Sequence, residues 1–134
     1  MREIVFRGKS VETGEWVYGY FVGYRAETYI FEPKEVHNGI DLGGYLDCCK
    51  MTEVDPATVG QYTGLKDKNG KRIFEGDVFE WGYAGVKEFR YVIVYDAELA
   101  SFVGERHYGF VSLNGIDIEI IGNIHDNPDL LDGN

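Results

Sequence analysis

The sequence predicts a mostly β protein in which an N-terminal sheet packs against a C-terminal SH3-like small barrel. Aromatic residues make up 15% of the 134 residues, and glycine occurs eighteen times while proline occurs three times. Several short stretches also alternate apolar and polar side chains. This balance is typical of short twisted strands joined by tight turns. The length and the 44% apolar content suit a single compact unit with its own core.

The N-terminal sheet is expected over residues 1–54. Residues 2–7 alternate in the manner of a strand with one buried face. The next strand places Trp16, Tyr18, Tyr20 and Val22 on one face and further apolar residues on the other. A strand that is apolar on both faces is expected in a central position, or with one face covered by a partner. Residues 27–31 form a third strand that Pro33 ends, residues 33–44 form a loop or wide hairpin, and residues 45–54 return to strand.

The barrel and a C-terminal turn are expected over residues 55–134, with Asp55-Pro56 at the internal boundary, so that the whole chain 1–134 forms one domain. Asn69-Gly70 predicts a two-residue hairpin turn with positive φ at both residues. A second bend follows at residues 75–77. Strands are expected at 78–81, 86–95, 101–103, 109–113 and 117–121, and one helical turn at 128–131. The expected turn positions are Gly64, Asn69, Gly70, Gly76, Asp77, Gly122 and Asn123.

The charge of the chain limits its ligands. The net charge is -10, which argues against a general nucleic-acid coat, since phosphate binding depends on Lys and Arg. A local site stays open, because one basic cluster could hold a phosphate or an acidic partner. The alternative interpretation of the cluster is a solvated turn. Its members are Lys66, Lys68, Lys71 and Arg72.

No catalytic residue, metal ligand or cofactor site is predicted. Three histidines are scattered through expected loops, namely His37, His107 and His125. Glu75 and Asp77 could act as paired carboxylates, but acceptance of hydrogen bonds from turn amides is the simpler interpretation.

The cysteines and the hydropathy pattern predict a cytoplasmic protein. Adjacent residues on a strand point to opposite faces, so Cys48 and Cys49 are expected as reduced thiols. The N-terminus lacks an apolar stretch of signal-peptide length. No run of residues approaches the length needed to cross a bilayer, so no membrane partner is expected.

Three sequence blocks identify a family resemblance. REIVFRGKS at 2–10, VDPATVGQYTGLKDKNGKRIFEGDV at 54–78 and IEIIGNIHDNPDLL at 118–131 resemble the YopX proteins of bacteriophages and prophages. The resemblance spans nearly the whole chain, and its motifs stand in the order typical of that family. It implies a β-rich fold, a phage or prophage origin and self-association in the host cytoplasm. It implies no established activity and no catalytic residues.

The leading functional hypothesis is a non-enzymatic accessory protein that binds protein through an apolar face. Trp16, Tyr18 and Tyr20 are the expected interface residues, and a homo-oligomer or a host or phage protein is the expected partner. One alternative is a nucleic-acid-associated module that uses the turn from Lys66 to Arg72. The other is an enzyme of unidentified class that uses Glu75, Asp77 or a histidine.

Overall fold

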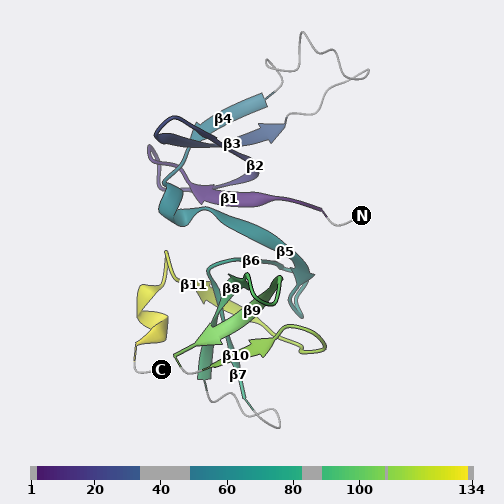
Figure 1. Ribbon diagram of the computed structural model, residues 1–134. Coiled ribbons are helices and arrows are strands. Elements are labelled where there is room, and N and C mark those ends of the chain that lie inside the picture. The colour runs from purple at the N-terminus through teal and green to yellow at the C-terminus, as the bar shows by residue number, and fades with distance from the viewer. Residues whose placement is uncertain (1–2, 34–48, 83–88, 108, 133–134) are drawn as a thin grey trace. The chain divides into compact units, whose positions relative to one another are not determined.

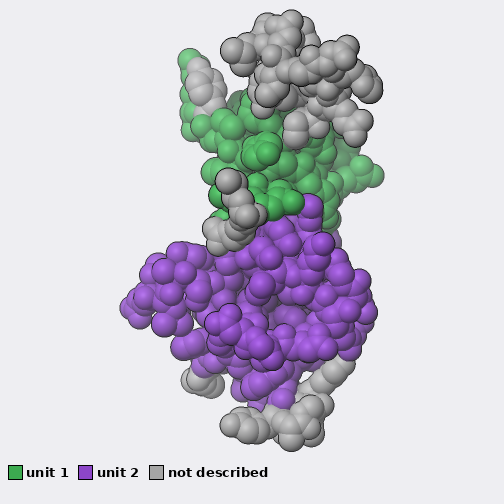
Figure 2. Space-filling model, turned by 90° about the vertical axis from the view of Figure 1, so that its right-hand side faces the viewer, with its two compact units in different colours: residues 1, 3–61 green, residues 2, 62–134 purple. Residues whose placement is uncertain are grey.

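The mostly β class is confirmed in a computed structural model of the chain, which describes residues 3–33, 49–82, 89–107 and 109–132. The described residues form eleven strands, β1 to β11, which Figure 1 labels. The helical elements of the described part are two short 3-10 turns, η2 (Pro56–Thr58) and η4 (Pro128–Leu131). The chain divides into two units, which Figure 2 colours separately. Unit 1 contains residues 3–61 and unit 2 contains residues 62–134.

Unit 1 is built on an antiparallel sheet with the strand order β4-β3-β2-β1-β5. Its strands are β1 (Phe6–Lys9), β2 (Trp16–Tyr24), β3 (Glu27–Pro33), β4 (Cys49–Glu53) and the start of β5 (Gly60–Lys66). The central position of β2, between β1 and β3, agrees with the apolar character of both its faces. Residues 34–44 of the expected loop and Cys48 lie outside the described residues, as does the side chain of Cys49, while Pro33 is the last residue of β3.

The buried side of unit 1 is centred on Ile30 and Val54, which are almost completely inaccessible to solvent. Gly8 packs directly on Val54, since a Cβ atom at Gly8 would lie 3.0 Å from the Val54 Cβ. The chain then leaves the sheet through η2, where the Asp55 carboxylate accepts a hydrogen bond from the Ala57 N–H at 3.0 Å. This capping arrangement is common at the start of short helices.

The division between the units lies within β5, after Gln61, rather than after residue 54 as the sequence predicted. The reason is the pairing of β5. Gly60 and Gln61 pair with β1, while Tyr62 and Lys66 pair with β6 (Arg72–Phe74). One strand therefore supplies hydrogen bonds to both units.

Unit 2 contains a five-stranded antiparallel sheet with the order β10-β9-β8-β7-β11. Its strands are β7 (Asp77–Trp81), β8 (Phe89–Asp96), β9 (Ser101–Arg106), β10 (Gly109–Ser112) and β11 (Ile120–Asn123). Pairing between the outer strands β10 and β11 is not found among the described residues. Closure into an SH3-like barrel therefore stays a prediction.

One face of this sheet forms the core of unit 2. The stacked rings of Phe79 and Tyr91 lie at its centre, with their centroids 5.5 Å apart. Gly104 makes room for them, because a Cβ atom there would come within 2.5 Å of the Phe79 ring. The buried members of the core are Ile73, Phe79, Tyr91, Ile93, Leu113, Ile118 and Ile120.

Two glycines expected in turns lie in strands instead. Gly64 belongs to β5 and Gly122 to β11, and both stand where the register of the strand pairing shifts. Gly64 has a positive φ of 89°, which a glycine adopts without the steric cost of a side chain. The local backbone irregularity is thus a bulge within each strand rather than a turn between strands.

The C-terminal strand also begins later than the sequence predicted, at Ile120 instead of residue 117. Ile118 is buried, yet its carbonyl accepts a hydrogen bond from the Lys68 N–H at 2.9 Å. The segment before β11 is therefore bound to the hairpin turn after β5 and not to a neighbouring strand.

Candidate functional site

The predicted interface residues lie on one face of the unit 1 sheet. Tyr18, Tyr20 and Val22 alternate along β2 and so project to the same side. The strand register aligns Tyr20 with Phe31 of β3, and Phe31 with Met51 of β4. Directly paired residues share a face, so these five side chains form one patch, which we call the aromatic face.

Much of the aromatic face is open to solvent. The exposed fraction is 46% for Tyr18, 53% for Tyr20, 37% for Val22 and 49% for Met51. Large apolar side chains at such exposure in one contiguous patch are a feature of interaction surfaces. Phe31 is partly buried between its neighbours.

Trp16 lies at the end of this row but in a different environment. The guanidinium carbon of Arg7 is 4.4 Å from the centroid of the Trp16 ring, and the Lys9 ammonium is 5.4 Å from it. Both cations project from β1 to the same side as Trp16, in keeping with the register of β1 and β2. The predicted anchor Trp16 is thus engaged in cation–π contacts within unit 1.

Acidic side chains lie on the same face of β3 and β4. Tyr29 pairs in register with Glu53, and its hydroxyl donates a hydrogen bond to the Glu27 carboxylate. This hydrogen bond, followed by desolvation and the charges of Glu27 and Glu53, raises the pKa of Tyr29 to about 12. Glu27 and Glu53 therefore border the aromatic face, and Lys9 lies near them, because the Asp55 N–H donates a hydrogen bond to the Lys9 carbonyl at 2.9 Å. Arg7 itself is buried.

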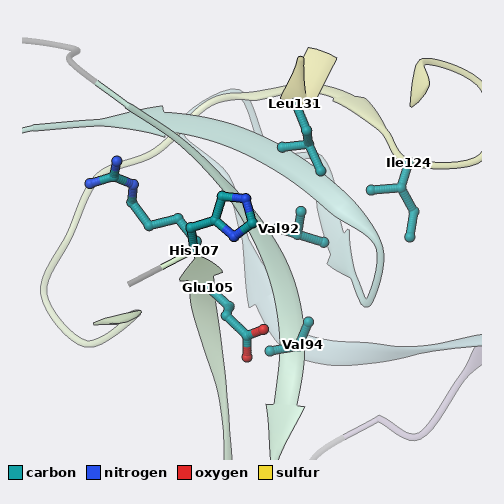
Figure 3. Close-up of a pocket in the computed structure, with 7 residues that line it drawn as sticks. Val92, Val94, Glu105, His107, Ile124 and Leu131 are labelled. Carbon is teal, nitrogen blue, oxygen red and sulfur yellow. The ribbon is translucent and has the colours of Figure 1, made fainter. Parts of the chain in front are cut away.

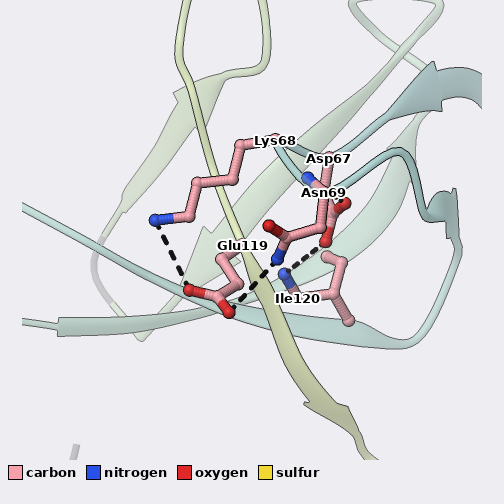
Figure 4. A network of polar contacts seen from close by, with 5 residues as sticks. All are labelled: Asp67, Lys68, Asn69, Glu119 and Ile120. Carbon is pink, nitrogen blue, oxygen red and sulfur yellow. Dashed lines mark hydrogen bonds and ion pairs between the residues drawn. The ribbon is translucent and has the colours of Figure 1, made fainter.

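The predicted basic cluster forms the turn between β5 and β6, shown in Figure 4. The Asp67 carbonyl accepts a hydrogen bond from the Gly70 N–H at 2.9 Å, and the Asp67 N–H donates to the Lys71 carbonyl at 2.8 Å. Gly70 has a φ of +82°, whereas Asn69 is not among the residues with positive φ. The predicted turn with two positive φ angles is therefore wrong. The observed loop combines one ordinary turn with one left-handed glycine.

The Asp67 carboxylate holds this turn together from a nearly buried position. One oxygen, Oδ1, accepts hydrogen bonds from the N–H groups of Asn69 and Lys71, both at 2.9 Å. The other oxygen, Oδ2, accepts one from the Ile120 N–H at 3.1 Å. Burial alone would raise the pKa of Asp67, but the three N–H donors and the charge of Lys71 outweigh it and lower the pKa.

The basic side chains of the turn differ in their surroundings. The Lys68 ammonium forms an ion pair with Glu119 at 3.4 Å, and the same carboxylate accepts a hydrogen bond from the Asn69 amide at 3.2 Å. The Arg72 guanidinium lies 5.3 Å from the centre of the Tyr62 ring. Lys66 and Lys71 are exposed. The predicted phosphate site therefore contains a carboxylate beside its cations, which weakens its attraction for phosphate.

The residues of the paired-carboxylate hypothesis serve the bend between β6 and β7. The buried Asp77 carboxylate accepts a hydrogen bond from the Phe74 N–H at 2.8 Å, and Gly76 in the bend has a φ of +89°. Asn123 has a related role at the end of β11, where its side-chain oxygen accepts hydrogen bonds from the N–H groups of His125 and Asp126. Asp77 is thus engaged in holding the bend.

Two histidines lie in described parts of unit 2. His107 follows β9 and His125 follows β11, while His37 is outside the described residues. Within the described ranges, no group of three or more His, Cys, Asp and Glu side chains is placed to hold a metal ion. No helix in that part of the chain is long and apolar enough to cross a membrane.

Sequence reasoning missed two members of the aromatic face, Phe31 and Met51. Both belong to strands that the sequence predicted in outline. Their alignment with Tyr20 depends on the register of three strands, and sequence patterns do not reveal that register.

These features define a class of protein, namely an antiparallel β protein of two units with an exposed aromatic sheet face. The chain belongs to the YopX family, because the family model described as YopX protein matches residues 5–132. It is similar to protein EF1440 from Enterococcus faecalis, a crystal structure, with a TM-score of 0.56 and 22% sequence identity. That similarity covers 98% of this chain and 99% of the other, and it concerns the fold alone. No curated protein matches the chain.

Proposed function

We propose that this YopX protein is a non-enzymatic phage or prophage accessory protein that binds protein through the aromatic face, and that a second copy of the chain is its first partner. The observation that carries the proposal is the exposure of Tyr18, Tyr20, Val22 and Met51 on one sheet face. Exposed aromatic and methionine side chains are enriched at the centres of protein interfaces.

The charge pattern favours a second copy as the partner. The aromatic face itself carries no charge, so two copies with a net charge of -10 each meet there with the least repulsion. The same uncharged patch can meet itself across a two-fold axis, as an isologous dimer requires.

The area of the face sets the expected strength of the dimer. The exposed parts of the four side chains amount to on the order of 400 Å², given that a large aromatic side chain offers roughly 150–250 Å². A standard specific interface buries about 800 Å² per partner. The aromatic face supplies about half of that, so we expect a reversible dimer with a dissociation constant on the order of micromolar.

Light scattering coupled to size exclusion tests the proposal. The monomer mass is 15.2 kDa, and we expect a larger mass that rises with protein concentration. The repulsion between two acidic copies is screened by salt, so the mass should increase modestly from low to high salt. Binding to nucleic acid would show the opposite dependence.

The matched variants are Tyr20→Ser on the aromatic face and Tyr95→Ser in unit 2, since both tyrosines are about half exposed. Loss of an interface anchor typically weakens binding by about tenfold or more, so Tyr20→Ser should shift the protein to monomer and Tyr95→Ser should not. If the wild type has the mass of one chain at tens of micromolar in both low and high salt, the dimer is ruled out. That protein concentration exceeds the dissociation constant estimated above.

The same face could also take a host or phage protein. A pull-down with the wild type and with Tyr20→Ser as bait distinguishes such a protein from a second copy of the chain as the partner of this face. A protein retained by the wild type alone would make the aromatic face a site for that protein. The nucleic-acid alternative has less support, because Lys68 is paired with Glu119 and Arg72 lies against Tyr62.

A further inference from the structure

A groove on unit 2 is formed by residues other than those of the aromatic face and plays no part in the proposed function. Figure 3 draws the residues that line it and labels all of them except Arg106. Val92 and Val94 come from β8, Glu105 from β9 and His107 from the turn that follows, while Ile124 and Leu131 belong to the C-terminal segment. The groove has a volume of about 410 Å³. This is within the usual range of small-ligand sites.

The alternation of β8 explains why the groove forms. Tyr91 and Ile93 point into the core of unit 2, so Val92 and Val94 point to the opposite face of the sheet. Glu105 pairs in register with Val92 and projects to the same side. The floor of the groove is therefore apolar, and a carboxylate stands at its border.

The C-terminal segment forms the other wall and is fixed in place. The Arg90 guanidinium donates a hydrogen bond to the Leu130 carbonyl at 2.8 Å. The Asn127 N–H donates to the Asn123 carbonyl at 2.9 Å, and the Asn127 side chain accepts from the Asn123 N–H at 3.3 Å. The groove is thus formed by ordered elements before any ligand binds.

The charge within the groove is that of Glu105. No described residue forms a hydrogen bond or ion pair with the Glu105 carboxylate group. Arg106 also borders the groove, but its side chain alternates to the other face of β9, where the guanidinium lies 3.5 Å from the centre of the Phe89 ring. Glu105 and His107 project into the groove together (Figure 3).

We propose that this groove binds an organic cation, namely a primary ammonium group on an apolar stem. The ammonium would donate hydrogen bonds to the Glu105 carboxylate, and the stem would lie against Val92, Val94 and Leu131. The net charge of -10 attracts cations to the protein and disfavours an anionic ligand. The ammonium group could belong to a free amine or to a lysine in a polypeptide.

The test compares 4-phenylbutylamine with its neutral analogue 4-phenylbutan-1-ol by NMR titration of backbone amides. A ligand of this size in a largely preformed groove should bind with a dissociation constant on the order of 1 mM. We expect shifts at Val92, Val94 and Leu131 and a preference for the amine of about fivefold, because the Glu105 carboxylate is partly screened by solvent.

Glu105→Gln is the decisive variant, since it removes the charge and keeps the shape of an exposed side chain. It should abolish the preference for the amine and leave binding of the alcohol unchanged. Glu98→Gln, in the exposed turn after β8, is the control and should preserve the preference. Equal binding of amine and alcohol to the wild type, or an undiminished preference in Glu105→Gln, would overturn the proposal. Absence of shifts with both ligands up to about 10 mM, tenfold above the expected constant, would overturn it as well.

A second pair of probes distinguishes the sources of the ammonium group. A capped tripeptide of leucine, lysine and phenylalanine is compared with the same peptide carrying norleucine in place of lysine. A preference for the lysine peptide that depends on Glu105 would assign the groove to a polypeptide partner. Binding of the free amine alone would assign it to a small molecule. Because the groove lies in unit 2, its binding can be lost or kept independently of the dimer proposed for unit 1.

Discussion

Replacement of Asp67 by asparagine should destabilise unit 2 strongly at neutral pH. The amide oxygen can still accept hydrogen bonds from the Asn69 and Lys71 N–H groups, but the amide nitrogen then faces the Ile120 N–H, donor against donor. Loss of one hydrogen bond to a charged group costs roughly 1.5–3 kcal/mol, and the two remaining bonds become neutral and weaker. We expect the free energy of unfolding to fall by about 3 kcal/mol.

The pH dependence of this effect has a defined sign. The folded-state pKa of Asp67 is lowered, so the carboxylate contributes stability above its unfolded pKa, and this contribution is lost as the pH falls through the folded value. The amide introduced by Asp67→Asn does not titrate. The difference in the free energy of unfolding between wild type and variant should therefore have its full size at neutral pH. It should decrease below about pH 4, where an unfolded aspartate takes up its proton.

Urea unfolding followed by tryptophan fluorescence measures this difference. The chain has two tryptophans, Trp16 in unit 1 and Trp81 in unit 2. Trp81 packs edge-on against the core residue Tyr91 at 6.2 Å, so a Trp16→Phe background reports the unfolding of unit 2.

Asp96→Asn is the matched control. The Asp96 carboxylate accepts hydrogen bonds from the Glu98 and Leu99 N–H groups, but in an exposed turn, so its replacement should cost less than about 0.5 kcal/mol. A cost below about 1 kcal/mol for Asp67→Asn, the worth of one ordinary hydrogen bond, would refute the reasoning. A difference from wild type that stays constant down to acidic pH would refute the electrostatic part.

Three further predictions concern packing, backbone conformation and ionisation. Gly104→Ala should destabilise unit 2 by about 2–3 kcal/mol, because its Cβ atom would collide with the buried Phe79 ring, and a cost below that of Gly70→Ala would contradict this packing. Gly70→Ala should cost only about 1 kcal/mol in the same urea assay, since its positive φ is strained for alanine but no atom lies near the added methyl group. Glu27→Gln should lower the pKa of Tyr29 from about 12 toward the ordinary value, which a 13C NMR titration of tyrosine can detect; an unchanged titration would refute the role of Glu27.

The sequence predicted the strands well where a periodic pattern reflects burial. The alternation from Trp16 to Val22 indicated both faces of β2, and its apolar character on both sides agreed with a central strand. The pattern could not reveal which side chains of other strands join Tyr18 and Tyr20. That information is in the strand register, which depends on contacts between segments far apart in the chain.

The hairpin turn shows a different limit of sequence reasoning. Asn69-Gly70 is a typical pair for a two-residue turn, and local preferences alone favour that form. The observed loop instead places the Asp67 carboxylate where it also accepts a hydrogen bond from Ile120. Likewise, the basic cluster contains an ion pair with Glu119, a residue that the sequence places in another strand region. Tertiary contacts decided both features.

Hydroxyl-radical footprinting at several protein concentrations tests the central claim most directly, because it locates the interface of the proposed dimer. The account predicts that oxidation of Tyr18, Tyr20 and Met51 decreases as the concentration rises through the micromolar range estimated from the area of the face. Tyr95 and Leu99, which are 50% and 51% exposed in unit 2, should keep a constant rate of oxidation. Unchanged oxidation of the aromatic face while the mass of the particle increases would contradict the claim, because the copies would then meet elsewhere.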